Sequence, residues 1–291
     1  MFYQPKSIGE ALELKAELKE SGAFIAGGTD LVVLMNRGIR PTENFIDLSH
    51  VKDLTAINKH NGTLELAGNV TFAQAGRLPI RCLAKAALSV GGPGIRELGT
   101  LAGNLATASP AGDGSTALLA LDAEVELSSA RGVRRLPLDK FFLSYRKTAL
   151  ASDEMITKIK IPTNYQTDWA KNGKRGAVNI SVVAVAVAIA PGLGSGGATV
   201  PVAKHSTTAS QRLAPPRVRI ALASVAPTPM RCHKAEEFLA KNGLDTGTIR
   251  QAVEIVRSEI KPITDHRASA DYKVHLAGVL VRRLLEKLVK A

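Results

Sequence analysis

Two short glycine-rich segments, residues 26–31 and 100–110, carry the residue types best suited to binding an anion. In the first, Ala-Gly-Gly-Thr-Asp-Leu, the paired glycines permit a tight turn with exposed backbone amides. Thr29 or Asp30 is placed to cap a helix that begins at Leu31, and amides beside a helix N-terminus attract phosphate. One such turn is more often a plain connection. Two of them, about seventy residues apart, predict a diphosphate held between two lobes.

Metal and nucleophile chemistry has little support in the sequence. The two cysteines, Cys82 and Cys232, are too few for an iron–sulfur cluster or a disulfide framework within this chain. The six histidines are scattered without the spacing of metal ligands, and no convincing nucleophile–base pair occurs. We therefore predict neither a catalytic residue nor a metal site in this chain.

Length and composition are those of a soluble globular protein. The chain has 291 residues, enough for two or three modest domains, and 45% of them are hydrophobic while 22% are charged. The N-terminus has no apolar signal-peptide core, and the longest apolar run, residues 182–190, is only strand-sized. These features predict a cytoplasmic protein without a membrane segment.

The positive charge lies almost entirely in the second half of the chain. Residues 1–130 hold 11 Lys and Arg against 14 Asp and Glu, a balance of −3, whereas residues 131–291 hold 27 against 12, a balance of +15. Such a basic half suits nucleic acid, an acidic partner protein or an anionic dinucleotide equally well. Against nucleic acid stand the few aromatic residues and the lack of a recognisable nucleic-acid motif.

The elements that must position the first glycine segment form a small α/β lobe. An amphipathic helix is predicted over residues 8–20, and a short buried strand over 23–26 runs into the glycine turn. A helix over 31–36 and a strand over 45–48 complete a lobe of about fifty-five residues. Ligands of open α/β folds bind at such strand-to-helix turns.

The second glycine segment lies in a larger lobe that mixes helices and strands. Helices are predicted over 79–90, ended by the glycines and proline of 91–94, and over 116–121, starting from Asp113. Strands are predicted over 64–68, 124–127, 133–138 and 155–161. Phe141, Phe142 and Tyr145 are expected to pack this lobe.

The remaining residues predict a strand pair followed by helices. Strands over 180–190 and 218–225 flank residues 191–212, an insertion rich in Gly, Ser and Thr. Residues 192–197 match G-x-G-x-x-G, but neither a helix nor an acidic residue follows at the spacing of a dinucleotide fingerprint, so we predict a hairpin loop without a nucleotide. The helices are predicted over 230–241, 248–261 and 272–290.

Several motifs in a common order carry a family resemblance. They are residues 26–31, 91–113, 145–148, 225–229 and 271–276. Together they resemble the FAD-binding subunit of the molybdenum hydroxylases, the family that includes xanthine dehydrogenase and the carbon monoxide dehydrogenase medium subunits. The resemblance covers essentially the whole chain.

This resemblance implies an α+β fold in two parts. The first is a two-lobed FAD-binding unit of the vanillyl-alcohol-oxidase or PCMH type over residues 1–172, with lobes at about 1–55 and 56–172. The second is an α+β C-terminal domain over residues 173–291, with a small antiparallel sheet plus helices.

The resemblance also implies which residues surround the cofactor. The first segment would hold the FAD diphosphate through the amides of Gly27, Gly28 and Thr29, and residues 100–104 would form an opposing loop. In full, the implied FAD-binding residues are Ala23, Phe24, Ile25, Ala26, Gly27, Gly28, Thr29, Asp30, Thr100, Leu101, Ala102, Gly103, Asn104, Thr107, Asp113, Ile156 and Lys171. Ala102 departs from the glycine usual in the family, which would set this loop slightly farther from the phosphates.

Three of these residues have plainer interpretations from the pattern alone. Ile156 sits in an alternating strand and would count as core, Lys171 could be a solvated loop charge, and Asp113 could merely cap its helix. The resemblance instead places Ile156 and Lys171 toward the flavin end of the cofactor, with Asp113 nearby.

The function implied by the resemblance is electron relay. In such complexes a molybdenum subunit oxidises the substrate, a subunit with two 2Fe–2S clusters carries the electrons, and FAD passes them to NAD+ or another acceptor. The expected partners are therefore an iron–sulfur small subunit and a molybdopterin-containing large subunit in a heterotrimer, with no nucleic acid and no membrane. Two alternatives stay open: a stand-alone flavin reductase of the same fold, and a basic nucleic-acid or adaptor protein without a cofactor.

Overall fold

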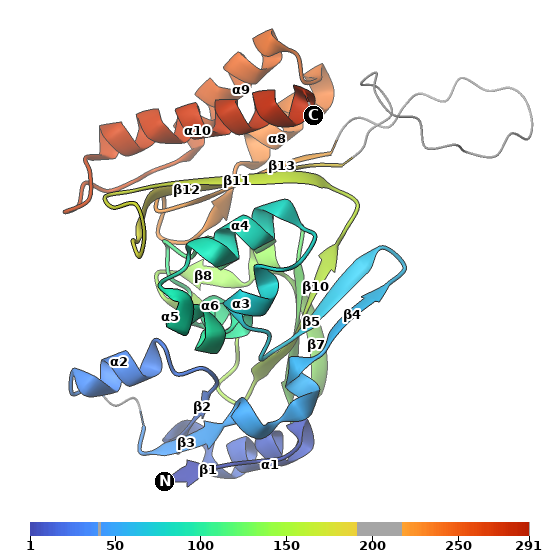
Figure 1. Cartoon of the computed structure of the whole chain (residues 1–291), viewed down its shortest axis with the longest axis vertical. Helices are drawn as coiled ribbons and strands as arrows, with labels where there is room; N and C mark the ends of the chain where they lie inside the picture. The colour runs from blue at the N-terminus through green and yellow to red at the C-terminus, as the bar shows by residue number, and fades with distance from the viewer. Residues whose placement is uncertain (40–41, 191–216, 291) are drawn as a thin grey trace, which may run out of the picture.

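The computed structural model describes residues 1–39, 42–190 and 217–290. A small N-terminal lobe, a middle lobe and a C-terminal sheet with its helices follow one another along the longest axis (Figure 1). The predicted loop over 191–212, with its G-x-G-x-x-G match, lies outside the described residues. Within the three described ranges, no helix has the length and apolar character needed to cross a membrane.

The N-terminal lobe is built on a three-stranded parallel sheet of order β1-β3-β2. Its elements are β1 Phe2–Tyr3, α1 Ile8–Leu18, β2 Gly22–Ile25, α2 Leu31–Asn36 and β3 Asn44–Asp47. Helix α1 begins after Ser7, whose hydroxyl oxygen accepts a hydrogen bond from the Glu10 amide at 3.2 Å. The lobe's core also contains Met155 from the middle lobe, so the two lobes share apolar contacts.

The middle lobe packs helices against a five-stranded antiparallel sheet of order β4-β5-β10-β6-β7. Its strands are β4 Ile57–His60, β5 Thr63–Ala67, β6 Glu124–Ser129, β7 Gly132–Pro137 and β10 Met155–Pro162, with a separate hairpin of β8 Phe142–Ser144 and β9 Lys147–Thr148. Its helices are α3 Phe72–Ala75, α4 Arg81–Ser89, α5 Pro93–Leu98, α6 Leu101–Thr107 and α7 Asp113–Ala120.

The C-terminal part is a four-stranded antiparallel sheet of order β11-β12-β13-β14. Its elements are β11 Gln166–Gly173, β12 Ser181–Ile189, β13 Val218–Ala223, β14 Met230–Arg231, α8 His233–Asn242, α9 Thr246–Glu259 and α10 Ala270–Lys290. Helices α8 to α10 cover one face of this sheet, while α4 and α7 of the middle lobe cover the other (Figure 1).

Strand β12 is buried along its whole length because helices cover both of its faces. Small residues line the side toward the middle lobe: Ala184, Ala186, Ala221 and Ala223. Larger ones line the side toward α8 to α10: Val183, Val185, Val187, Ile220 and Leu222. The alanines let α4 and α7 pack closely on the sheet, so the middle lobe and the C-terminal sheet form one continuous core.

Three segments differ from the sequence-based expectations. Helix α5 was not predicted, because residues 91–94 were expected only to end the preceding helix. Pro93 can start α5, since the first position of a helix does not need a backbone N–H. Strand β11 was not predicted, although its neighbour β12 was. Tyr145 does not pack the lobe: Phe141 is fully buried, but Tyr145 lies in the exposed β8–β9 turn.

The sheets favour an earlier division of the chain than the predicted one at residues 172 and 173. Strand β11 pairs with β12 in the C-terminal sheet, and a boundary after residue 172 would cut it. We therefore propose the same two parts, with the C-terminal part starting before Gln166.

A buried carboxylate joins the middle lobe to the C-terminal helices. Asp168 on β11 is 1% exposed and accepts hydrogen bonds from Lys85 of α4 and, at 2.6 Å, from Lys287 of α10. Burial alone would raise the pKa of Asp168, but the bonds from Lys287 and Lys85 outweigh it and hold that pKa below its ordinary value.

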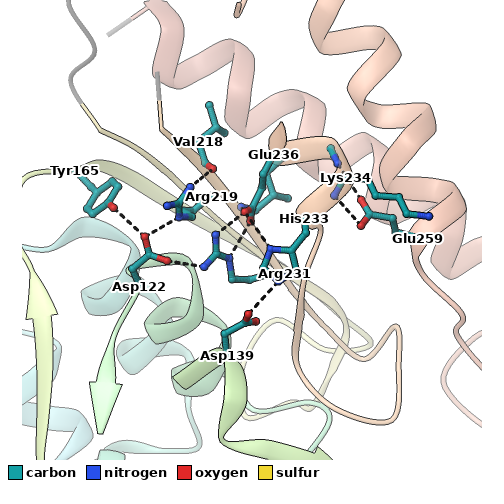
Figure 2. A network of polar contacts seen from close by, with 12 residues as sticks. Asp122, Asp139, Tyr165, Val218, Arg219, Arg231, His233, Lys234, Glu236 and Glu259 are labelled. Carbon is teal, nitrogen blue, oxygen red and sulfur yellow. Dashed lines mark hydrogen bonds and ion pairs between the residues drawn. The ribbon is translucent and has the colours of Figure 1, made fainter. Parts of the chain in front are cut away.

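A second network joins the end of α7 to the C-terminal sheet (Figure 2). Asp122 accepts hydrogen bonds from Arg219 at 2.6 Å, from Arg231 at 2.5 Å and from the Tyr165 hydroxyl at 3.0 Å. Arg231 also pairs with Glu236 of α8 at 2.5 Å. Both networks resist separation of the two parts of the chain, because separation would leave charged groups without their partners.

Asp168→Asn should lower the free energy of unfolding at pH 7 by about 1–2 kcal/mol, since it weakens charge-assisted hydrogen bonds to half-exposed lysines. Because the pKa of Asp168 is depressed, its contribution is present above the unfolded pKa of about 4 and is lost as the pH falls through the folded pKa. Urea unfolding at pH 7 and pH 3 measures both effects. The exposed Asp53→Asn is the control; equal curves for both variants would contradict the assignment.

Candidate functional site

The first glycine segment forms the predicted turn between β2 and α2. Gly28 has φ +66°, a left-handed conformation that favours glycine, and its carbonyl accepts the first α2 hydrogen bond from Val32 at 2.9 Å. Asp30 occupies the N-cap position of α2, yet within the described part of the chain its carboxylate does not bond the helix amides. It accepts instead from the Thr107 hydroxyl at 3.5 Å, so the predicted side-chain cap is wrong.

The second glycine segment is a helix, not the predicted opposing loop. Thr100 caps α6, and its hydroxyl oxygen accepts from the Gly103 amide at 3.0 Å. Leu101 and Leu105 are buried in the middle-lobe core, which holds the helix in place. Residues 100–104 therefore contribute a helix N-terminus, and Ala102 is the second residue of that helix.

The two segments lie in direct contact. A Cβ placed on Gly27 would be 1.7 Å from the Leu98 carbonyl oxygen, so only glycine fits there. A Cβ placed on Gly99 would be 3.2 Å from the Thr29 hydroxyl oxygen. Gly99 thus places the N-terminus of α6 beside the start of α2, and the Asp30–Thr107 contact joins the start of α2 to the last residue of α6, so both helices meet at one junction between the lobes.

Backbone donors are available at this junction. Among the described residues, the amides of Gly27, Gly28 and Thr29 donate no hydrogen bond to the protein. Polar backbone groups usually find a partner, and free amides beside a helix N-terminus favour an anion.

A buried ion pair lies next to α6. Asp113, the first residue of α7, accepts from Lys171 of β11 at 2.6 Å and from the Ser89 hydroxyl at 3.2 Å. The Asn104 side chain links α6 to this helix, because its oxygen accepts from the amide and hydroxyl of Ser115 at 3.3 and 3.2 Å. The predicted residues Asn104, Asp113 and Lys171 are thus held in one neighbourhood.

One carboxylate oxygen of Asp113 remains available. Its Oδ1 is buried and has no hydrogen-bond partner within the described ranges. Burial raises the pKa of the Asp113 carboxyl, and the Lys171 ammonium only partly offsets that effect. Both plainer interpretations are wrong: Asp113 does not cap its helix, and Lys171 is a buried strand residue rather than a loop charge.

Ile156 is buried in the core, as its alternating pattern predicts. It lies near the start of β10, and a Cβ placed on Gly68 would be 2.5 Å from its carbonyl oxygen. Its neighbour Met155 belongs to the N-terminal core, so this strand passes where the two lobes meet. The predicted approach of Ile156 to a flavin stays a prediction.

Sequence reasoning missed several residues that shape the site. Leu98 supplies the carbonyl against which Gly27 packs, while Ser89 and Ser115 bond Asp113 and Asn104. These residues follow no motif spacing. Their contacts depend on how α4, α5 and α7 pack, which periodicity does not report.

Comparison with known proteins assigns both parts of the chain to described families. Residues 1–164 match the FAD binding domain in molybdopterin dehydrogenase. Residues 170–288 match the CO dehydrogenase flavoprotein C-terminal domain. The α+β fold expected from the resemblance is confirmed.

Individual relatives match over nearly the whole chain. The chain is 34% identical to the nicotinate dehydrogenase FAD-subunit of Eubacterium barkeri, over 94% of this chain and 90% of that protein. It is 29% identical to the carbon monoxide dehydrogenase medium chain of Hydrogenophaga pseudoflava, over 98% and 95%. The solved structure of reconstituted CO dehydrogenase from Oligotropha carboxidovorans matches with a TM-score of 0.84 and 26% identity, over 99% of this chain and 97% of that chain.

The residues at the lobe junction fit FAD. The glycines at 27 and 28 let the turn pack against the Leu98 carbonyl and against Val32, and the three unbonded amides suit a diphosphate. The buried, unpartnered oxygen of Asp113 suits a hydroxyl or N–H donor of the ligand.

Gly28→Val should abolish FAD retention. The branched side chain would sit at φ +66° with its Cβ 3.1 Å from Val32, straining the turn by about 1–2 kcal/mol and displacing the amides that would bind the phosphates. The control is Gly38→Val, which has a similar φ of +79° but open space around its Cβ. Flavin absorbance per folded chain measures the effect, and full flavin content in folded Gly28→Val would sink the assignment.

Lys171→Met should lower the free energy of unfolding at pH 7 by about 3 kcal/mol, because it leaves the Asp113 carboxylate buried without a cation. The loss should shrink as the pH falls from neutral, since the raised pKa of Asp113 lets protonation remove that charge. The double variant Asp113→Asn/Lys171→Met keeps neither charge and should lose less than the single one. Denaturant unfolding of the three proteins measures this, and an equally large loss in the double variant would contradict it.

Proposed function

We propose that this chain relays electrons inside a molybdenum hydroxylase complex. It belongs to the family of FAD-binding medium subunits of these enzymes. Its relatives are subunits of oxidoreductases, and this chain is an oxidoreductase subunit as well. The proposed partners are an iron–sulfur small subunit that delivers electrons and a molybdenum-binding large subunit that oxidises the substrate. Heterotrimeric assembly and a cytoplasmic location are part of the same proposal.

The contact between the two glycine segments carries this proposal. The amides of Gly27, Gly28 and Thr29 would bind the diphosphate of FAD from the N-terminal lobe. The N-terminus of α6, at residues 100–104, would face the diphosphate from the middle lobe. Thr107, at the other end of α6, would lie near the cofactor through its contact with Asp30. Residues 23–26 and Asp30 would form the strand and turn that present these amides.

Asp113 and Lys171 would hold the polar part of the cofactor in position. Lys171 keeps a positive charge against Asp113, which favours the ionised carboxylate that burial alone would disfavour. The free Oδ1 of Asp113 would then accept a hydrogen bond from the cofactor. Ile156 would add an apolar contact.

When bound, FAD supplies the redox chemistry by collecting two electrons and passing them to NAD+ or another acceptor. The chain itself binds, orients and electrostatically tunes this group. We expect the large subunit to determine the substrate.

Colour and co-purification test the proposal against its alternatives. A purified chain with flavin absorbance excludes the basic nucleic-acid or adaptor protein without a cofactor. Co-purification with iron–sulfur and molybdenum subunits excludes the stand-alone flavin reductase. A colourless, folded chain that binds no added FAD would overturn the proposal.

Association with the iron–sulfur partner should slow as ionic strength rises. The balance of +15 over residues 131–291 attracts an acidic partner at long range, and salt shortens that range to about 10 Å at 0.1 M. Reduction of the flavin by a small neutral dihydroquinone should respond far less. Stopped-flow measurements on separately purified subunits test both; an association rate that stays flat with salt would reopen the nucleic-acid interpretation of the charge.

A further inference from the structure

A surface groove of about 470 Å³ lies between α9 and α10, away from the glycine segments. The two helices run in opposite directions (Figure 1). Each lines the groove with residues three or four positions apart, namely Arg250, Glu254 and Arg257 on α9 and His275, Gly278 and Arg282 on α10. Each lining spans seven positions, about 10 Å of helix, which matches two turns of a third helix packed between these ridges.

At the bottom of the groove, Arg257 of α9 packs against Gly278 of α10. A Cβ placed there would lie 2.5 Å from Nε of Arg257, so glycine allows this guanidinium to rest on α10. Nη1 of Arg257 pairs with Glu254 at 2.6 Å. Its Nε is buried, however, and lacks an acceptor in the part of the chain that the structure describes. This nitrogen lies against α10, while the Arg257 side chain as a whole is 31% exposed and places its positive charge at the groove.

The charges around the groove select an acidic occupant. Arg250, Arg257 and Arg282 stand against the single Glu254, a balance of three minus one, or +2. Beyond Arg282 the same helix carries the exposed Arg283 and Lys290, together with Glu286 and with Lys287, which is already paired with Asp168. A helix with carboxylates spaced by three or four positions complements this pattern.

The groove is separated from the proposed FAD site by a full sheet. Helices α9 and α10 lie on one side of β11 and β12, and α4 lies on the other (Figure 1). Helix α7, which begins with Asp113, packs on β12 from the same side as α4. Packed layers stand about 10 Å apart, so the groove and the ion pair of Asp113 are roughly 20 Å or more apart. A partner seated in the groove would therefore stabilise the assembly without delivering electrons to the flavin.

We propose that the α9–α10 groove binds an acidic helix of a partner subunit and serves as an assembly contact distinct from the electron-entry surface. This inference rests on the proposed function, because it requires the partner subunits of the complex. It assigns one part of the basic C-terminal surface to a defined occupant.

Charge reversal at the rim tests the proposal. The chain is co-expressed with its iron–sulfur and molybdenum partner subunits, and the complex is purified through a tag on the large subunit. Arg250→Glu/Arg282→Glu should reduce the retained flavoprotein by about tenfold or more, because like charges then face the acidic helix. The matched control is Lys52→Glu/Lys59→Glu, an equal charge change at exposed positions outside the C-terminal part, which should assemble like wild type.

A photo-crosslinking residue at Gln251 identifies the occupant. The crosslinked peptide should come from an Asp- and Glu-rich helix of a partner subunit. A crosslink to a second copy of this chain, or normal assembly of the Arg250→Glu/Arg282→Glu variant, would overturn the proposal. Failure of the proposed function is recognised separately, since the wild-type chain would then lack FAD or bind neither partner.

Discussion

The absence of a side chain at Gly27 is the constraint on which the site depends. Any Cβ there would collide with the Leu98 carbonyl oxygen at 1.7 Å and push the N-terminal lobe away from the middle lobe. With glycine, the turn after β2 reaches the residues just before α6, and two helix N-termini meet at the lobe junction. The proposed diphosphate site is therefore made largely of backbone, whose amides and helix dipoles suit an anion without a dedicated basic side chain.

Two buried carboxylates and one half-buried carboxylate, that of Asp122, hold the layers around this junction in a fixed relation. Asp113 joins α7 to β11, Asp168 joins β11 to α4 and α10, and Asp122 joins the end of α7 to the C-terminal sheet. Each is matched by Lys or Arg, because an unpaired buried charge is costly in a low-dielectric interior. Asp113 and Lys171 form such a pair in the proposed cofactor site, where one oxygen of the Asp113 carboxylate remains available to the ligand.

Ion pairs within the chain leave a large excess of Lys and Arg in residues 131–291. Many carboxylates of the basic half, including Glu154, Glu236 and Asp265, are already engaged by arginines or lysines of the same chain. The surplus Lys and Arg must therefore face solvent or another protein. We propose that this surface has two separate tasks: fast docking of a partner near the flavin, and lasting assembly on the far side of the C-terminal sheet.

The sequence by itself determined the features that depend on local chemistry and periodicity. The glycine turn, α2 over 31–36, the alternating strand β10 and the family motifs could all be predicted, because turn geometry and hydrophobic spacing depend on neighbouring residues. Only the tertiary structure decided that residues 100–104 begin a helix, that β11 joins the C-terminal sheet and that Lys171 is buried against Asp113. That ion pair joins residues 58 positions apart, and no local pattern reports which distant charge will share a low-dielectric site.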